Sequence, residues 1–180
     1  MRELSLHILD IIQNSIRAKA ELVQLLINED IKNDRLLIEI TDDGCGMGQD
    51  LQQRVLDPFV TSRTTRKVGL GLSLFQQAAR QCEGDLKIKS ALGEGTVITV
   101  NFKYSHIDRA PLGDIVGTIV TILSVNPDLE LLYRHVINDK EFVFDTRIIK
   151  DELEDVQINL PEILSWLEGY LTEGLEDLRR

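Results

Sequence analysis

The 180-residue chain has little cysteine, few aromatic residues and no excess of positive charge. Its two cysteines, Cys45 and Cys82, form no CxxC pair and are too few for a disulfide framework or a cysteine-based zinc site. No apolar run approaches the ~20 residues of a membrane-spanning helix, and residues 1–3 do not begin a signal peptide. The 20 basic and 30 acidic residues give a net charge of −10, which argues against binding nucleic acid or an anionic membrane through bulk charge. We therefore expect a cytoplasmic protein that binds neither nucleic acid nor membrane.

Charge and glycine are distributed unevenly along the chain, of which hydrophobic residues make up 43%, enough to bury a core. Residues 1–103 carry 13 basic and 14 acidic residues, whereas residues 104–180 carry 7 basic and 16 acidic ones. Eight of the 12 glycines lie in the first part. A polar segment at residues 105–113, which contains Pro111, is the expected join. We therefore predict two modules, residues 1–103 and an acidic C-terminal α/β module at residues 104–180.

Hydrophobic periodicity and turn residues predict an alternation of helices and strands. In the first part the expected helices are 4–20, 51–55 and 70–81, and the expected strands are 22–28, 35–41, 86–90 and 96–102. In the second part we expect helices at 114–125, 148–155 and 161–178, with strands at 129–137 and 141–144. Asp114 is a plausible N-cap for the first helix of that part. The pattern predicts an α/β fold in which a helical layer lies on a mixed or antiparallel sheet, a two-layer sandwich.

The first helix carries a polar stripe that does not belong in a buried helix. His7, Asp10, Asn14 and Arg17 recur at spacings of three and four, so they share one face. One interpretation is a face exposed to solvent. The other is a metal and phosphate face, in which Asn14 offers a carbonyl oxygen to Mg²⁺, Asp10 orients water or binds the ion, and Arg17 reaches phosphate oxygens.

Two short glycine loops lie further along the chain. Residues 42–47 (DDGCGM) follow a strand directly, so their glycines allow positive φ and let a flat ring approach the backbone, while a buried aspartate can accept from an exocyclic amine. Residues 68–73 (VGLGLS) precede a helix, and the free amides at its start point at anything negative. Neither loop is a Walker A motif or a GxGxxG dinucleotide fingerprint.

Taken together, these features resemble the ATP-binding superfamily of histidine kinases, gyrase B, MutL and the related heat-shock chaperones. Five motifs carry the resemblance, and they occur in the superfamily's order over about residues 1–103. They are residues 10–17 (DIIQNSIR), similar to the N box, residues 42–47 as the first glycine box, residues 57–59 (DPF) as the phenylalanine box, residues 69–72 (GLGL) as the second glycine box and residues 93–96 (GEGT) as the last glycine box.

The resemblance implies an ATP or ADP site with Mg²⁺. Asn14 would bind the metal, Arg17 would lie beside the phosphates, and Asp42 would accept a hydrogen bond from the adenine amine with support from Thr96. The other nucleotide-binding residues that the resemblance implies are Gly44, Gly46 and Met47 at the base, Phe59 of the phenylalanine box, and Gly69, Leu70, Gly71 and Leu72 at the phosphates. Residues 60–68 would form a lid over the triphosphate, with positive charge from Arg63, Arg66 and Lys67.

The chain departs from the superfamily's pattern in two ways. Members that split ATP usually carry glutamate as general base four residues before the metal-binding asparagine, and this chain has Asp10 there. Aspartate is one methylene shorter, so it either positions water poorly or becomes a second Mg²⁺ ligand. The chain also begins close to the N box, so we expect it to lack the upstream hairpin that carries the phosphoacceptor histidine of a sensor kinase. His106, in a segment that faintly resembles a phosphoacceptor box, is the one alternative acceptor.

The acidic C-terminal part fits no well-known domain. Its last helix has a leucine stripe beside Trp166 and Tyr170, which either packs on the preceding hairpin or docks on a partner protein or second subunit. The leucines are Leu164, Leu167, Leu171, Leu175 and Leu178. Since the triphosphate would repel so acidic a module, we expect it at one sheet edge or on the face away from the lid.

The sequence thus predicts an Mg-ATP-binding protein that acts on a separate protein in trans, as a histidine or serine kinase or as a nucleotide-gated regulator. Two alternatives stay open. One is a non-catalytic accessory subunit of a larger redox complex, because the chain is similar to stand-alone members encoded beside multisubunit iron hydrogenases. The other is a slow ATPase switch like MutL. A homodimer is compatible with each of these.

Overall fold

The computed structural model describes residues 2–57 and 70–180, with the side chain of Leu70 left out. The helices are α1 (Leu4–Arg17), α2 (Gln49–Val55), α3 (Leu70–Gln81), α4 (Ile115–Val125), α5 (Thr146–Leu153) and α6 (Pro161–Arg179). The strands are β1 (Leu22–Asp30), β2 (Arg35–Asp42), β3 (Asp85–Ala91), β4 (Gly95–Lys103), β5 (Glu130–Ile137) and β6 (Lys140–Asp145). In the described residues no helix is both long and apolar enough to cross a membrane.

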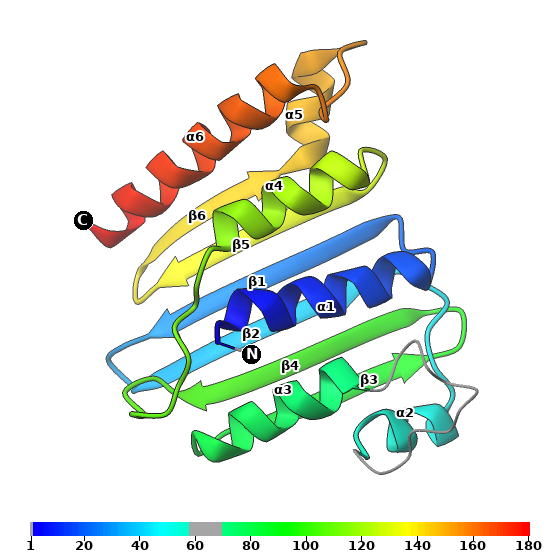
Figure 1. The fold of residues 1–180 in the computed structure, drawn as a ribbon, viewed down its shortest axis with the longest axis vertical. Helices are drawn as coiled ribbons and strands as arrows, with labels where there is room; N and C mark the ends of the chain where they lie inside the picture. The colour runs from blue at the N-terminus through cyan, green and yellow to red at the C-terminus, as the bar shows by residue number, and fades with distance from the viewer. Residues whose placement is uncertain (1, 58–69) are drawn as a thin grey trace.

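The six strands form one sheet in the order β3-β4-β2-β1-β5-β6. The β1–β5 pair is parallel and the other four pairs are antiparallel. Helices α1, α3, α4 and α6 lie over one face of this sheet (Figure 1). Alternate residues of β1 and β2 point into that layer and are buried, which is the period-two pattern of a sheet with one covered face. The predicted two-layer α/β sandwich with a mixed sheet is confirmed.

Helix α1 lies at the centre of the helical layer and packs against both α3 and α4 (Figure 1). Its apolar residues Leu4, Ile8 and Ile12 are fully buried. The free amides of Leu4 and Ser5 at its start donate to the carbonyls of Pro111 and Leu112, 3.0 and 2.8 Å away. The C-terminal part of the chain therefore helps to hold the helix that carries the polar stripe.

Helix α1 ends three residues earlier than the apolar pattern predicts. Lys19 adopts a left-handed conformation with a φ of 60°, and its amide donates to the carbonyl of Ile16. This turn closes the helix at Arg17 and leads the chain directly into β1. It leaves Asn14 and Arg17 in the last turn, where they face the loop that follows β2.

The C-terminal strands continue the sheet at one edge. Strand β5 pairs with β1 from Leu22↔Glu130 to Glu29↔Ile137, and the buried residues of both strands belong to one hydrophobic core. The division into modules at residues 103 and 104 stays a prediction, but strands from both sides of that point share a sheet and a core. The expected position of the acidic part at a sheet edge agrees with this topology.

A buried polar chain crosses the β1–β5 pair. The Nε2 atom of His135 lies 2.7 Å from a carboxylate oxygen of Glu29, and its Nδ1 lies 2.7 Å from the hydroxyl of Tyr133. His135 and Tyr133 are fully buried. Tyr104 donates to the second carboxylate oxygen of Glu29, and Arg179 at the end of α6 lies 3.7 Å from the first. Hydrogen bonds from His135 and Tyr104, and the nearby charge of Arg179, outweigh burial and lower the pKa of Glu29. His135 is therefore a structural histidine.

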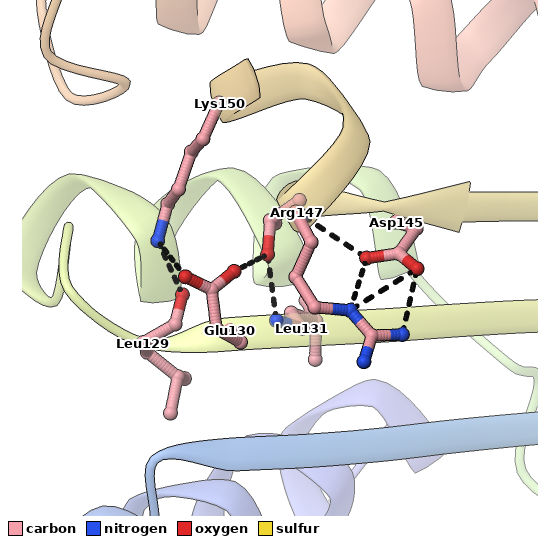
Figure 2. Close-up of polar contacts among 7 residues, drawn as sticks. Leu129, Glu130, Leu131, Asp145, Arg147 and Lys150 are labelled. Atoms are coloured by element: carbon pink, nitrogen blue, oxygen red, sulfur yellow. Dashed lines mark hydrogen bonds and ion pairs between the residues drawn. The ribbon is translucent and has the colours of Figure 1, made fainter.

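Helix α5 is tied to the start of β5 by polar contacts (Figure 2). Lys150 donates to the Glu130 carboxylate and to the Leu129 carbonyl at 3.0 and 3.1 Å. The buried hydroxyl of Thr146 accepts from the Leu131 amide and donates to Glu130. The Asp145 carboxylate caps the helix by accepting from the Arg147 amide, which explains why α5 starts two residues earlier than the apolar pattern predicts.

The leucine stripe of α6 packs inside the molecule. Leu167 and Leu171 are fully buried, Leu178 is 6% exposed, and Leu164 and Leu175 are half-buried against the same core. The helix lies on α4, β5 and β6. The interpretation that the stripe packs on the preceding hairpin is thus confirmed. Docking of this stripe on a partner is wrong, because the leucines are already covered.

Candidate functional site

A cavity of about 660 Å³ lies between α1, the loop after β2, α2 and the start of α3. This volume is in the range of small-molecule binding sites, about 300–1,000 Å³. The wall is mostly apolar, with a few polar side chains. The lining residues are Ile11, Asn14, Ser15, Arg17, Ala18, Asp42, Cys45, Gly46, Met47, Leu51, Leu72, Thr96 and Ile98.

Asp42 places a carboxylate in this cavity. It is the last residue of β2, only 8% exposed, and it pairs across the strands with Thr96. One carboxylate oxygen accepts from the hydroxyl of Ser15 at 2.6 Å, and the other accepts from the Gly44 amide at 2.9 Å. Each carboxylate oxygen has about two acceptor positions, so Asp42 keeps capacity for a donor in the cavity. The side chain is therefore held in one orientation while it can still recognise a ligand.

The first and last glycine boxes fit closely against each other. Gly46 has a φ of 69°, and a Cβ there would overlap the carbonyl of Ala91. Gly95 has a φ of 90°, and a Cβ there would overlap the carbonyl of Asp42. The amide of Gly93 donates to the carbonyl of Cys45 at 2.8 Å. Only glycine permits this approach, which brings the 93–96 turn beside Asp42.

Two serines and a glutamine brace these loops. The Ser90 hydroxyl accepts from the Met47 amide and lies 2.8 Å from the Thr96 hydroxyl. The Gln52 amide nitrogen donates to the carbonyls of Met47 and Ser90. Together with Ser15, these residues were missed by sequence reasoning. The available signal for Ser15 was its position as a serine on the apolar face of a buried helix, and Ser90 and Gln52 gave no signal.

The polar stripe of α1 divides into three environments. Asn14 and the exposed Arg17 line the cavity, and Arg17 donates to the Asn14 side-chain oxygen at 3.0 Å. Half-buried Asp10 is not among the cavity's described lining residues but lies beside α3, where a Cβ at Gly71 would sit 3.5 Å from its carboxylate. His7 is part of the core. The stripe is therefore neither wholly a solvent face nor wholly a binding face.

His7 stacks on Phe75 of α3 with ring centroids 4.6 Å apart and an interplanar angle of 5°. It is 3% exposed, and its Nδ1 has no hydrogen-bond partner among the described residues. Burial lowers the pKa of His7 to about 4. His7 is consequently neutral at pH 7.

The structure brings together one predicted group of site residues and leaves another outside its description. Asn14, Arg17, Asp42, Gly46, Met47, Leu72 and Thr96 line one cavity, Gly44 contacts Asp42, and Asp10 lies beside Gly71. Leu70 begins α3, and its side chain is not described. Phe59, Arg63, Arg66, Lys67, Gly69 and the predicted lid at residues 60–68 lie outside the described residues.

Comparison with known proteins agrees with this geometry. Residues 2–106 match the family described as histidine kinase-, DNA gyrase B-, and HSP90-like ATPase. The autoinducer 2 sensor kinase/phosphatase LuxQ of Vibrio harveyi is 35% identical over 100 residues, which are 53% of this chain and 11% of LuxQ. The signal transduction histidine-protein kinase AtoS of Escherichia coli is 38% identical over 63 residues, 35% of this chain and 10% of AtoS. The chain thus spans about a tenth of the length of these relatives.

Two solved structures share the fold. The Aquifex aeolicus MutL ATPase domain complexed with ADP matches with a TM-score of 0.51 and 15% identity, covering 81% of this chain and 63% of that one. The N-terminal domain of a DNA repair protein matches with a TM-score of 0.54 and 14% identity, covering 79% of this chain and 52% of that one. Both matches extend beyond residue 106. With its five motifs, its glycine boxes in contact and more than half of its length in the family match, the chain belongs to the histidine kinase-, DNA gyrase B- and HSP90-like ATPase family.

Proposed function

We propose that the chain binds Mg-ATP in the cavity beside α1 and that the bound nucleotide governs its action on a separate protein. The observation that carries the proposal is the buried Asp42 carboxylate, fixed by Ser15 and Gly44 in a mostly apolar cavity. A buried carboxylate costs free energy unless donors satisfy it, and the acceptor positions that Ser15 and Gly44 leave open suit an exocyclic amine. The ADP complex of the MutL ATPase domain, which has the same fold, supports a nucleotide as ligand.

Residues around Asp42 fit a flat base. Thr96 places a hydroxyl beside the carboxylate, held by Ser90. Gly46 presents bare backbone to the cavity, and Met47 and Ile98 supply apolar wall. In this proposal Asp42 selects the amine of adenine, and the apolar residues exclude water from the ring.

The other end of the cavity suits phosphates. Arg17 supplies charge and Asn14 an amide oxygen. The described residues hold no group of three or more acidic, histidine or cysteine side chains for a metal. Mg²⁺ commonly binds through one or two protein ligands together with phosphate oxygens and water, so Asn14 alone or with Asp10 fits it. The ion would offset the negative charge of the triphosphate.

Asp10 is the proposed residue for any reaction with water. It lies beside Gly71 in the second glycine box, the motif assigned to the phosphates, so it is placed near where the phosphates would lie. Its role would be to hold a water molecule or to act as a second oxygen ligand for Mg²⁺. The shorter side chain favours slow hydrolysis over fast turnover.

Two modes of action on the partner are proposed. Similarity to LuxQ and AtoS, both named as kinases, supports phosphoryl transfer in trans. The packing of α1 supports nucleotide gating as the second mode. This helix carries Asn14, lies between α3 and α4, and is held at its start by Pro111 and Leu112. A shift of α1 on nucleotide binding would therefore be transmitted to the C-terminal part of the chain.

Ligand-dependent stabilisation tests the binding step. Mg-ATP at a hundredfold excess over Kd should stabilise the folded chain by about 2.7 kcal/mol. Asp42→Asn should abolish this shift, because the amide replaces one of the two acceptor oxygens with a donor and the remaining oxygen cannot serve Ser15, Gly44 and adenine together. Asn14→Ala should mainly remove its Mg²⁺ dependence. Glu39→Gln is the matched control: it changes the same charge on the same strand, and Glu39 bonds Thr99 away from the cavity. An unchanged shift in a folded Asp42→Asn variant would contradict the adenine assignment.

A further inference from the structure

The outer face of α6 remains available after its leucines are buried. We define the Trp166 face as Glu162, Trp166, Gly169, Tyr170 and Glu173, which recur at spacings of three and four along the helix. Trp166 is 52% exposed and Tyr170 is 38% exposed. The two rings are neighbours and form a contiguous aromatic patch, and contiguous exposed apolar patches mark interaction sites.

The two aromatic rings are held in position. Trp166 stacks on Tyr170 with centroids 5.3 Å apart and an interplanar angle of 16°. Tyr170 rests in turn on Phe142 and Phe144 of β6, with centroids 5.9 and 6.3 Å away. Close packing of the helix at Gly174, where a Cβ would overlap Phe142, fixes this arrangement. The pair is a rigid platform, which lowers the entropy lost on binding.

The space beside the platform is open. A Cβ built on Gly169 meets no atom within 4 Å, so nothing of the described chain fills the surface next to Trp166. Glu162 lies one turn before Trp166, and Glu173 follows Tyr170 by three residues. Both are exposed, so an aromatic surface is bordered at each end by a carboxylate.

The stretch of chain that carries this face is strongly acidic. Residues 151–178 contain nine acidic residues and no lysine, arginine or histidine, and all nine acidic side chains are exposed. Among the described residues only one of the nine pairs with a basic group, Asp177 with Arg180. The charges of this region are therefore not balanced within the described chain.

We propose that the Trp166 face docks a basic segment of the partner protein. This inference rests on the proposed action in trans and names the chemistry of the partner. A lysine or arginine side chain packs on the face of Trp166 by a cation–π contact, while Glu162 and Glu173 pair with basic groups on either side. The two carboxylates are about 16 Å apart along a helix that rises ~1.5 Å per residue. An extended segment at ~3.3 Å per residue covers that distance in about five residues, so the segment carries basic residues about five positions apart.

A synthetic peptide with two arginines five positions apart, a third arginine between them for Trp166 and alanines elsewhere tests the proposal on the full chain. Trp166 is the sole tryptophan, so its fluorescence reports binding at this face without a label. The peptide should change the emission in a saturable way at low salt, and 0.5 M salt should weaken binding at least tenfold. A peptide with glutamines in place of the arginines should have no effect. Absence of a saturable change with the arginine peptide overturns the proposal.

Two matched double variants separate this face from general charge attraction. The double variant Glu162→Gln, Glu173→Gln should bind the arginine peptide at least tenfold more weakly than the wild-type chain. The double variant Asp151→Asn, Glu152→Gln removes the same charge from α5 and should weaken binding of the arginine peptide less than twofold. Equal weakening by both pairs overturns the proposal. Trp166→Ala, followed with a labelled peptide, should also lose at least tenfold, and unchanged circular dichroism should show that each variant folds.

Two further measurements identify what occupies the Trp166 face and separate this proposal from the proposed nucleotide binding. Sedimentation that shows a dimer lost in Trp166→Ala would assign the face to a second copy and overturn the basic segment. The Mg-ATP thermal shift should persist in all these variants. If the wild-type chain binds the peptide but shows no such shift, nucleotide binding fails while this surface stands; the opposite result rejects the surface alone.

Discussion

The two parts of the chain place their polar groups in opposite directions. In residues 2–106, Asp42, Asn14 and Thr96 point into one apolar cavity. In the later part the nine acidic side chains of residues 151–178 are exposed, and the buried polar residues His135 and Thr146 are satisfied within the fold. In the two proposals above, the inward-facing groups bind a nucleotide and the outer face of α6 binds a segment of a partner protein. The family match ends where the inward arrangement ends.

Removing residues 104–180 tests most directly whether the two parts of the chain are independent. It would strip β5 from β1 and α4 from α1, and it would take away the acceptors of the Leu4 and Ser5 amides. We expect loss of cooperative unfolding in denaturant and loss of the Mg-ATP shift. If residues 1–103 instead fold and bind ATP alone, the predicted two-module division holds and the shared core is dispensable.

Gly46→Ala should have the next largest effect. A left-handed conformation costs a non-glycine residue about 1–3 kcal/mol, and here the Cβ also overlaps the Ala91 carbonyl. We expect more than ~3 kcal/mol of destabilisation in urea melts, together with loss of nucleotide binding. Retained binding at full stability would show that the two glycine boxes do not need their close contact.

His7 should make the first part sensitive to acid. Its pKa is about 4 in the folded chain and about 6.5 when unfolded, so protonation favours the unfolded state. The penalty is nearly absent above pH 7 and grows as the pH falls from 6.5 to 4, reaching about 2.5 kcal/mol at pH 4.5. His7→Phe keeps the stack on Phe75 and should remove this part of the pH dependence. His106→Gln, in the turn after β4, serves as the control; equal curves for wild type and His7→Phe would reject the assignment.

Gly169→Ala should have the smallest effect and the opposite sign. The position lies inside α6, and the added methyl group meets open space. Alanine stabilises a helix interior by about 0.8–1 kcal/mol relative to glycine, so thermal unfolding should shift upward. Gly46 cannot carry a side chain because a neighbouring carbonyl fills the space, whereas no described atom near Gly169 would meet a side chain. The two variants therefore form a contrasting pair. A destabilised Gly169→Ala would mean that the outer face of α6 is not open.

Local chemistry made much of the fold predictable. Helix α3 starts and ends where the apolar pattern predicts, and Asp114 caps α4 by accepting from Gly117 as expected. Errors at helix ends had local causes, such as the left-handed Lys19 after α1. Long-range pairing could not be predicted. The residues of β5 alone do not indicate that it pairs with β1, because the register of a parallel pair depends on packing across the whole sheet.

The site was predictable in its residue types but not in its supports. Asp42, Asn14 and Thr96 occur in motifs whose order carries information, and the structure gathers them in one cavity. Ser15, which holds Asp42, gave only a weak signal because a serine on a buried helix face has many uses. The leucine stripe of α6 was ambiguous for a similar reason. Periodicity shows that a face is apolar but not whether the chain itself covers it.

The parallel β1–β5 pair also sets an order of events during folding. Glu29 and His135 are 106 residues apart, so one side of the central strand stays unpaired until most of the chain has emerged from the ribosome. The other side can pair at once with β2 through a short turn. Closing the long loop between β1 and β5 costs conformational entropy before the stabilising contacts of this pair form, and this makes the step slow. During synthesis the exposed edge of β1 is a place where a second nascent chain could add its own strand, so slow translation would prolong this exposure and favour aggregation through that edge.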